Sequence, residues 1–147
     1  WMATLLVPGL ALGALLIARR WRDAVLVAGT LIVSVALVQL LKSVFGRSRP
    51  ADMLVASDFG SFPSGHTANA ATLAALAIVL FPRLWVVMIA IAWTLAMAFS
   101  RTVLSVHWLS DTFGGMLVGA GATMLVAAIL LPWVRRARTA EAIEEAA

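Results

Sequence analysis

Residues that can handle a phosphate group occur in three short segments of an otherwise apolar chain. The first segment, KSVFGRSRP at 42–50, carries three cations; the second is PSGH at 63–66, and the third is SRTVLSVHWLSD at 100–111. Phosphoryl transfer needs positive charge around the phosphate oxygens, a nucleophile in line with the breaking bond, and a proton for the leaving group. The three segments contain side chains for each of these tasks, so we treat them as one candidate site.

The phosphate-binding part of this site is predicted from charge and from a helix start. Arginine and lysine side chains supply positive charge and, for arginine, forked hydrogen bonds. The Ser-Gly-His step follows a proline and begins an apolar run, where unpaired backbone N–H groups and the helix dipole favour an anion. The predicted phosphate-binding residues are Lys42, Arg49, Ser64, Gly65 and Arg101.

Two histidines, His66 and His107, are the candidates for nucleophile and general acid. His107 and Asp111 are four residues apart, so we expect them on one helical face, where the carboxylate can fix the imidazole tautomer. Such a pair is also common as a purely structural hydrogen bond, and the residues alone leave open which histidine attacks phosphorus. There is no carboxylate cluster and no cysteine, so the predicted reaction uses neither a metal nor another cofactor.

Composition places the site in a membrane protein. Of 147 residues, 63% are hydrophobic and 12% are charged, and the mean hydropathy is +1.00, which is far more apolar than a soluble domain. Five apolar runs, at about 3–18, 24–41, 67–80, 84–99 and 108–131, predict an all-α bundle of five transmembrane helices. The third and fourth runs, of about 15 to 17 residues, are short for a hydrocarbon core of about 30 Å. Small residues at Gly115, Gly119 and Gly121 suit close helix contacts.

Alternation of the runs sorts the basic residues onto two sides of the membrane. One side carries Arg19, Arg20, Arg22, Arg83, Arg135, Arg136 and Arg138, and the other carries Lys42, Arg47, Arg49, Arg101 and both histidines. The first set marks the cytoplasm, so the site is expected at the extracytoplasmic face of the plasma membrane. Simple anchoring to lipid headgroups is the alternative reading of the second set. Because the cations occur in short clusters between apolar runs, nucleic-acid binding is not expected.

The three segments resemble the signature of the type 2 phosphatidic acid phosphatase superfamily. That pattern is Lys, six residues, Arg-Pro; then Pro-Ser-Gly-His; then Ser-Arg, five residues, His, three residues, Asp, and every position is present at 42–111. The resemblance implies that His107 is the nucleophile that becomes phosphohistidine, that Asp111 supports it, and that His66 is the general acid. It also implies phosphate binding by the five residues named above. Arg47 falls between signature positions and is predicted to be a headgroup or loop contact.

Membrane members of this family commonly have six helices, whereas one apolar run precedes the Lys42 segment here. We therefore expect a family core that lacks the first helix, with the N-terminus outside. Residues 1–138 form the predicted transmembrane phosphatase domain and 139–147 a short cytoplasmic tail. Asp52 and Asp58 are predicted to be solvated loop residues, the latter able to steer substrate.

The resemblance implies a phosphatase that acts on a lipid phosphate, such as phosphatidate, phosphatidylglycerophosphate, or a polyprenyl phosphate or diphosphate. The expected partners are this substrate and the surrounding membrane lipids. Two alternatives remain. A phosphotransferase would pass the phosphoryl group to a sugar or lipid hydroxyl, and a non-catalytic lipid-binding or transport protein would keep only the fold.

Overall fold

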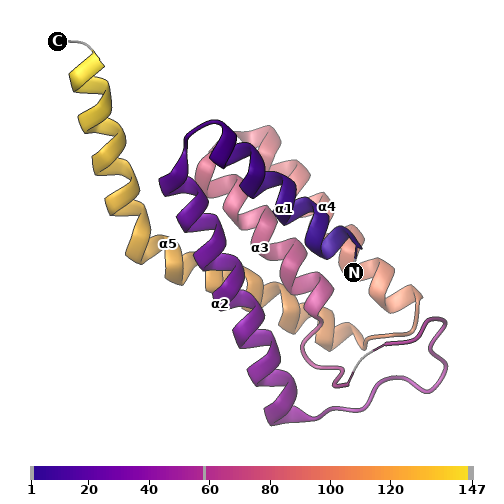
Figure 1. Cartoon of the computed structure of the whole chain (residues 1–147). Helices are drawn as coiled ribbons and strands as arrows, with labels where there is room; N and C mark the ends of the chain where they lie inside the picture. Colours follow the sequence, from indigo (N-terminus) through magenta and orange to yellow (C-terminus); the bar gives the residue numbers. More distant parts are fainter. Residues whose placement is uncertain (1, 58, 146–147) are drawn as a thin grey trace.

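The computed structural model describes the backbone of residues 2–57 and 59–145, and the side chains of 5–57 and 59–136. Its helices are α1 (Met2–Ile17), α2 (Trp21–Phe45), α3 (Gly65–Leu80), α4 (Leu84–Val103) and α5 (Leu109–Glu145). They form a bundle from which the C-terminal part of α5 projects (Figure 1). No strand occurs in the described ranges. The prediction of an all-helical membrane bundle with five helices is confirmed.

Three of these helices are long and apolar enough to cross a membrane, at 21–45, 84–103 and 109–136. The third helix has 16 residues, as its apolar run predicts. The fourth is longer than predicted, with 20 residues, because the polar Ser-Arg-Thr step at 100–102 continues the helix instead of ending it. The predicted tail at 139–147 continues α5 as far as Glu145, and its last two residues lie outside the described part of the chain.

Helix α3 lies at the centre of the bundle and packs against each of the other four helices. A cluster of buried aliphatic side chains joins α2, α3 and α5 at the end of α3 away from its first residue. Its members are Leu26, Val27, Leu76, Val126 and Val134. Burial of α3 on several sides explains why this helix, although short, can hold residues in a fixed position.

Two glycines allow α5 to approach α3 closely. A Cβ added at Gly115 would lie 2.5 Å from the carbonyl oxygen of Ser64, and one at Gly119 would overlap the carbonyl oxygen of Ala68. These positions are four residues apart and face the same helix, as expected for a small-residue contact. The prediction that Gly121 belongs to this contact is wrong, because nothing lies within 4 Å of a Cβ placed there.

Buried hydroxyl groups also connect the helices. The Ser34 and Thr72 hydroxyl oxygens are 2.8 Å apart between α2 and α3. The Thr123 hydroxyl group donates to the carbonyl oxygen of Thr72 at 3.5 Å, between α5 and α3. Since polar groups in an apolar interior must be satisfied, these bonds fix how the three helices are rotated about their axes.

The signature residues lie in two connections, 46–64 and 104–108, and in the adjoining ends of the helices, and the two connections meet at one end of the bundle (Figure 1). Helix α2 ends at Gly46, whose φ of 50° reverses the chain and whose N–H bonds the Lys42 carbonyl. The Leu54 N–H donates to the Leu104 carbonyl at 3.1 Å, and the Ser61 N–H donates to the Arg47 carbonyl at 2.8 Å. The long loop is therefore closed on itself and tied to the loop after α4.

Candidate active site

Two predicted phosphate ligands, Lys42 and Arg49, are held by consecutive carbonyl groups of the long loop. Lys42 is buried, and its Nζ lies 3.4 Å from the carbonyl oxygen of Phe59. The Arg49 Nη2 donates to the carbonyl oxygen of Gly60 at 3.0 Å. Gly60 has a φ of 76° and lies against the Lys42 stem, where an added Cβ would be 3.2 Å from Lys42 Cβ. A glycine at this position thus lets the loop cover the lysine and orient both cations.

Arg49 also contacts the predicted nucleophile. Its Nη1 is 2.6 Å from the carbonyl oxygen of Val106 and 3.2 Å from Nε2 of His107. A guanidinium can only donate, so Nε2 of His107 must accept, and the single proton of the neutral ring then resides on Nδ1. The Nε2 lone pair is therefore directed at the cation that would hold a phosphate oxygen.

The electrostatic surroundings of His107 favour its neutral form. Its pKa falls from 6.5 to about 4, first because the ring is buried and second because the Arg49 cation is close. Lys42 lowers the pKa further, whereas the Asp111 carboxylate raises it. A neutral imidazole keeps a lone pair at physiological pH, which is the state that a nitrogen nucleophile needs.

Asp111 lies on the other side of the His107 ring, 3.6 Å from Nδ1 through Oδ2. That carboxylate oxygen accepts hydrogen bonds from the hydroxyl group of Ser61 and from the Trp108 N–H, the latter at 2.9 Å. The two predicted partners therefore approach each other, but not on one helical face as expected. Ser105 adopts a left-handed φ of 52° and α5 begins only at Leu109, so His107 precedes the helix.

Arg47 has a different role from the one that the sequence predicts. Its Nη1 is 2.7 Å from Oδ1 of Asp111 and 2.7 Å from the Ser110 hydroxyl oxygen, and its guanidinium lies 5.7 Å from the centre of the Trp108 ring. The prediction of a headgroup or loop contact is wrong, because Arg47 is the ion-pair partner of a fully buried carboxylate. A buried carboxylate needs such a partner, and no spacing rule identifies it.

Ser61 is a second residue that the sequence did not single out. Its side chain is fully buried and its hydroxyl group donates to Asp111, fifty residues away. It is separated from the PSGH segment by one residue, Phe62. Serine is common in loops, so only the spatial contact distinguishes Ser61 from its neighbours.

The PSGH segment begins α3 as predicted. Ser64 is the N-cap, and its hydroxyl oxygen accepts from the N–H and the hydroxyl group of Thr67, at 3.5 and 3.1 Å. Its own N–H donates to the Asp111 carbonyl oxygen at 2.9 Å, which ties the first turn of α3 to the first turn of α5. Gly65 and the half-buried His66 follow in that first turn. The N-terminus of α3 thus lies beside the His107 cluster.

Arg101 occupies the last turn of α4. Its Nη2 donates to the Ser100 hydroxyl oxygen at 3.0 Å. Its carbonyl oxygen accepts from the Val106 N–H at 3.3 Å. In the described ranges no hydrogen bond joins the Arg101 side chain to His107 or Asp111, and its buried Nε has no hydrogen-bond partner. Of the two loop carboxylates, Asp52 is exposed as predicted, and Asp58 lies outside the described residues.

Comparison with known proteins identifies relatives of this chain. The family model described as the PAP2 superfamily matches residues 23–136. The chain is 35% identical over 111 residues to a lipid A 1-phosphatase of Rhizobium johnstonii, covering 68% of this chain and 45% of the relative. It is 32% identical over 114 residues to a lipid A 1-phosphatase of Rhizobium etli, covering 68% and 47%. The chain therefore spans about half the length of these two relatives.

Two crystal structures of relatives share the fold. The LpxE structure from Aquifex aeolicus superposes with a TM-score of 0.73 at 27% identity, over 84% of this chain and 76% of that one. A transmembrane PAP2-type phosphatidylglycerolphosphate phosphatase from Bacillus subtilis superposes with a TM-score of 0.68 at 29% identity, over 85% and 66%. The matched family region contains all three signature segments and most of the chain. The chain belongs to the PAP2 superfamily.

Proposed function

We propose that this chain hydrolyses a phosphomonoester or diphosphate carried by a membrane lipid, with His107 as the covalent nucleophile. One observation carries the proposal. A buried, neutral imidazole presents Nε2 to the Arg49 guanidinium at 3.2 Å, with Lys42 near enough to affect its pKa. A phosphate bound by these cations would have its phosphorus atom next to the lone pair that attacks it.

In the first step, Nε2 of His107 bonds to phosphorus and the bond from phosphorus to the lipid oxygen breaks. The departing oxygen takes a proton from His66, which is in the first turn of α3. The products of this step are the free lipid alcohol, or lipid monophosphate, and a phosphohistidine. Asp111 stabilises the positive charge that develops on the imidazole during attack.

In the second step, a water molecule gives its proton to neutral His66 and its oxygen attacks phosphorus. The bond from phosphorus to Nε2 breaks, inorganic phosphate forms, and both histidines return to their starting states. No redox partner is needed for either step.

The remaining predicted residues form the phosphate cradle in this proposal. Arg49 exchanges its contact with Nε2 for a phosphate oxygen, and Lys42 adds charge beside it. The Ser64 hydroxyl group accepts both of its contacts with Thr67, so its own proton remains available to donate. Gly65 contributes the N–H of a helix start. The buried Nε of Arg101, which lacks a partner in the described residues, suits an additional phosphate oxygen.

Arg47 and Ser61 are assigned as positioning residues. In this proposal neither residue contacts the substrate. Arg47 donates to Oδ1 of Asp111 and Ser61 donates to Oδ2. The carboxylate is thereby held where its Oδ2 faces Nδ1 of His107. Fixing the orientation of the supporting carboxylate preserves the tautomer that leaves Nε2 free.

The substrate class rests on the membrane setting and on the relatives. The similar proteins are named for lipid A and for phosphatidylglycerolphosphate, two lipids with terminal phosphate groups. We extend this class to phosphatidate and to polyprenyl phosphates and diphosphates, and we place the site at the extracytoplasmic face of the plasma membrane. A loop of 46–64 leaves no room for a separate recognition domain, so the lipid tail is selected by the helices.

The test measures phosphate release by the purified full chain from a panel of lipid mono- and diphosphates. His107→Ala is expected to lower turnover by about 10³-fold or more, because the nucleophile is lost. His66→Ala is expected to lose turnover on lipids. With p-nitrophenyl phosphate, whose leaving group needs no proton, it should still phosphorylate His107 and release a burst of about one nitrophenolate per chain, because only the hydrolysis step then lacks its base. Wild-type turnover in His107→Ala would refute the nucleophile assignment. Transfer of phosphate to an added alcohol in preference to water would identify a phosphotransferase instead.

A further inference from the structure

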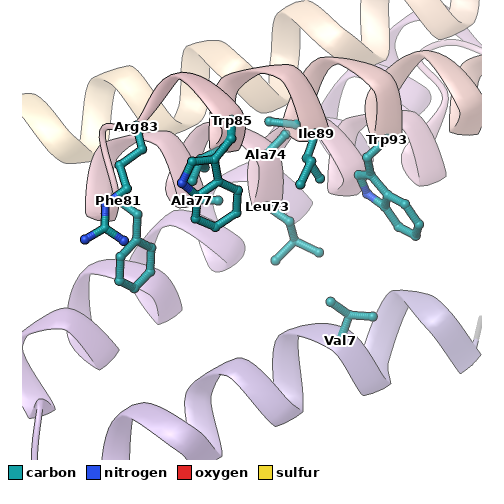
Figure 2. Close-up of a pocket in the computed structure, with 11 residues that line it drawn as sticks. Val7, Leu73, Ala74, Ala77, Phe81, Arg83, Trp85, Ile89 and Trp93 are labelled. Atoms are coloured by element: carbon teal, nitrogen blue, oxygen red, sulfur yellow. The ribbon is translucent and has the colours of Figure 1, made fainter.

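A pocket of about 450 Å³ lies between α1, α3 and α4, outside the site described above. Figure 2 shows Leu73 and Ala77 of α3 and Ile89 of α4 pointing toward it, with Val7 of α1 on the opposite wall. Apart from Arg83, the side chains that line it are apolar. In a membrane-spanning bundle we expect such an apolar space to face lipid.

The pocket exists because α1 and α4 do not contact each other. Both helices pack on other members of the bundle, α1 on α2 and α3 and α4 on α3 and α5, in the described residues. The small side chains of alanines at positions 74, 77 and 90 line the pocket and leave its space unfilled. Ile89 leaves 60% of its surface exposed, and Trp93 leaves 43%. The pocket is thus a groove that the described chain leaves open.

Positive charge lies at one end of this groove. The guanidinium of Arg83 lies beside Phe81 there (Figure 2), and the Arg20 guanidinium is 5.7 Å from the centre of the Phe81 ring. Arg20 is paired with Asp23 at 2.7 Å. Arg83 has no acidic partner in the part of the chain that the structure describes. A guanidinium at the mouth of an apolar groove matches a phosphate attached to a hydrocarbon chain.

This end of the groove is remote from His107. Helix α3 starts beside the catalytic cluster and ends at Leu80, next to Phe81. Its 16 residues correspond to about 24 Å. We therefore expect Arg83 at the level of the lipid headgroups on the opposite face of the membrane, away from the substrate phosphate of the proposed reaction.

We propose that this groove binds one acyl chain of an anionic glycerophospholipid, whose phosphate pairs with Arg83, in the leaflet opposite the His107 site. The chain would lie along Leu73, Ala77 and Ile89, and Trp85 would pack beside the headgroup, as tryptophans do at membrane interfaces. An apolar helix could fill the groove but would leave the Arg83 cation without an anion. A phospholipid supplies both an apolar chain and a phosphate, so we favour a lipid as the occupant. This binding is separate from catalysis and does not depend on the proposed reaction.

The experiment uses the full chain in vesicles of equal phosphatidylcholine and phosphatidylglycerol. The protein is extracted in mild detergent, and its retained lipids are counted by native mass spectrometry. Phosphatidylglycerol is chosen because its phosphodiester lacks the terminal phosphate of the proposed substrates. We expect the wild-type chain to retain phosphatidylglycerol in preference to phosphatidylcholine.

Two substitutions and two controls test the groove. Arg83→Gln is expected to lower the ratio of phosphatidylglycerol to phosphatidylcholine about five-fold, the effect of one arginine near an anionic surface. Ala77→Leu fills the groove and is expected to abolish retention of both lipids. Arg136→Gln removes a cation from the same end of the bundle, and Ala92→Leu enlarges an exposed position of α4 outside the pocket. Both controls are expected to behave as the wild-type chain does.

An unchanged lipid ratio in Arg83→Gln overturns the proposal, as does full retention in Ala77→Leu. If no lipid is retained and the chain is instead a dimer that Ala77→Leu dissociates, the groove is occupied by a second copy and the proposal is also wrong. Since Arg83 is exposed, its replacement tests the lipid ratio even where the Ala77 variant does not fold.

Discussion

The surroundings of His107 change its pKa in opposite directions. Burial and the Arg49 cation disfavour the imidazolium ion, and the Asp111 carboxylate favours it. The first two effects are larger, so the ring is neutral in the free protein and can act as a nucleophile. In the proposed reaction the ring becomes positive as attack proceeds. The same carboxylate would then stabilise the ring, while the bound phosphate would neutralise the cations. One arrangement thus serves both the resting state and the transition state.

We expect kcat/KM to fall as the pH decreases through about 4, the pKa of His107. The folded chain binds fewer protons than the unfolded chain between this value and 6.5. The stability contributed by the neutral ring is therefore present above pH 6.5 and lost as the pH falls toward 4. The expected fall in kcat/KM is checked on the acid side of the pH–rate profile, measured with a soluble substrate. Asp111→Asn should move it to lower pH, and a shift to higher pH would contradict the assigned charges.

Arg47 is expected to control turnover without binding substrate. Arg47→Gln removes a charged hydrogen bond to Asp111, which should lower kcat about ten-fold or more while KM changes little. It also leaves the Asp111 carboxylate, which raises the pKa of His107, without its ion-pair partner, so the acid side of the pH–rate profile should move upward. Arg47→Lys, which keeps the charge, should restore part of kcat. A large rise in KM with unchanged kcat would show that Arg47 contacts the substrate instead.

At the scale of helices, the site depends on the close contact between α3 and α5. Ser64 at the start of α3 bonds the backbone of Asp111 at the start of α5. Gly115 and Gly119 then let the two helices stay together for the following turns. A shift of either helix would separate the α3 N-terminus from the His107 cluster, so helix packing and site geometry are coupled.

Gly119→Ala is therefore expected to destabilise the chain by about 1–3 kcal/mol, because its Cβ would overlap the Ala68 carbonyl oxygen. Gly121→Ala in the same helix is the matched control. It meets open space and should change stability by no more than about 0.5 kcal/mol. Thermal unfolding in one detergent measures both. Equal effects of the two substitutions would show that the glycine contact does not limit stability.

At the scale of the whole molecule, the two ends of the bundle differ in what their cations do. At one end, Arg47 and Arg49 are engaged with buried polar groups of the site. At the other end, Arg22 lies over the Trp21 ring at 4.8 Å, and Arg83 lies at the open groove. Arginine and tryptophan together are typical of a membrane interface. Tryptophan occurs at both interfaces, but basic residues are enriched on the cytoplasmic side, so the arginines at this end support our proposal that it faces the cytoplasm.

The orientation can be tested because the sequence contains no cysteine. Ala51 in the loop after α2 and Ala18 in the turn after α1 are both exposed, at opposite ends of the bundle. We expect a membrane-impermeant maleimide to label Ala51→Cys in intact cells, but Ala18→Cys only after lysis. The reverse pattern would place the proposed site on the cytoplasmic side.

The residues of the site differ in how far sequence could predict them. The signature histidines, cations and Asp111 were predicted because the family signature has reactive side chains at fixed spacings. Arg47 and Ser61 were not, since their roles come from contacts with Asp111 across more than forty residues. The length of the short α3 could be predicted from its apolar run. The extension of α4 through Arg101 could not, because a helix can continue into polar residues at a membrane interface.

The sequence by itself determined the membrane bundle and the family, because lipid permits few structures for apolar runs and the signature spacing is specific. The tertiary structure decided how the three segments meet. Only there does Arg49 reach Nε2 of His107, do Arg47 and Ser61 hold Asp111, and does the ring become buried enough to be neutral. Burial and long-range contacts depend on which helices pack together, and no local pattern of residues specifies them.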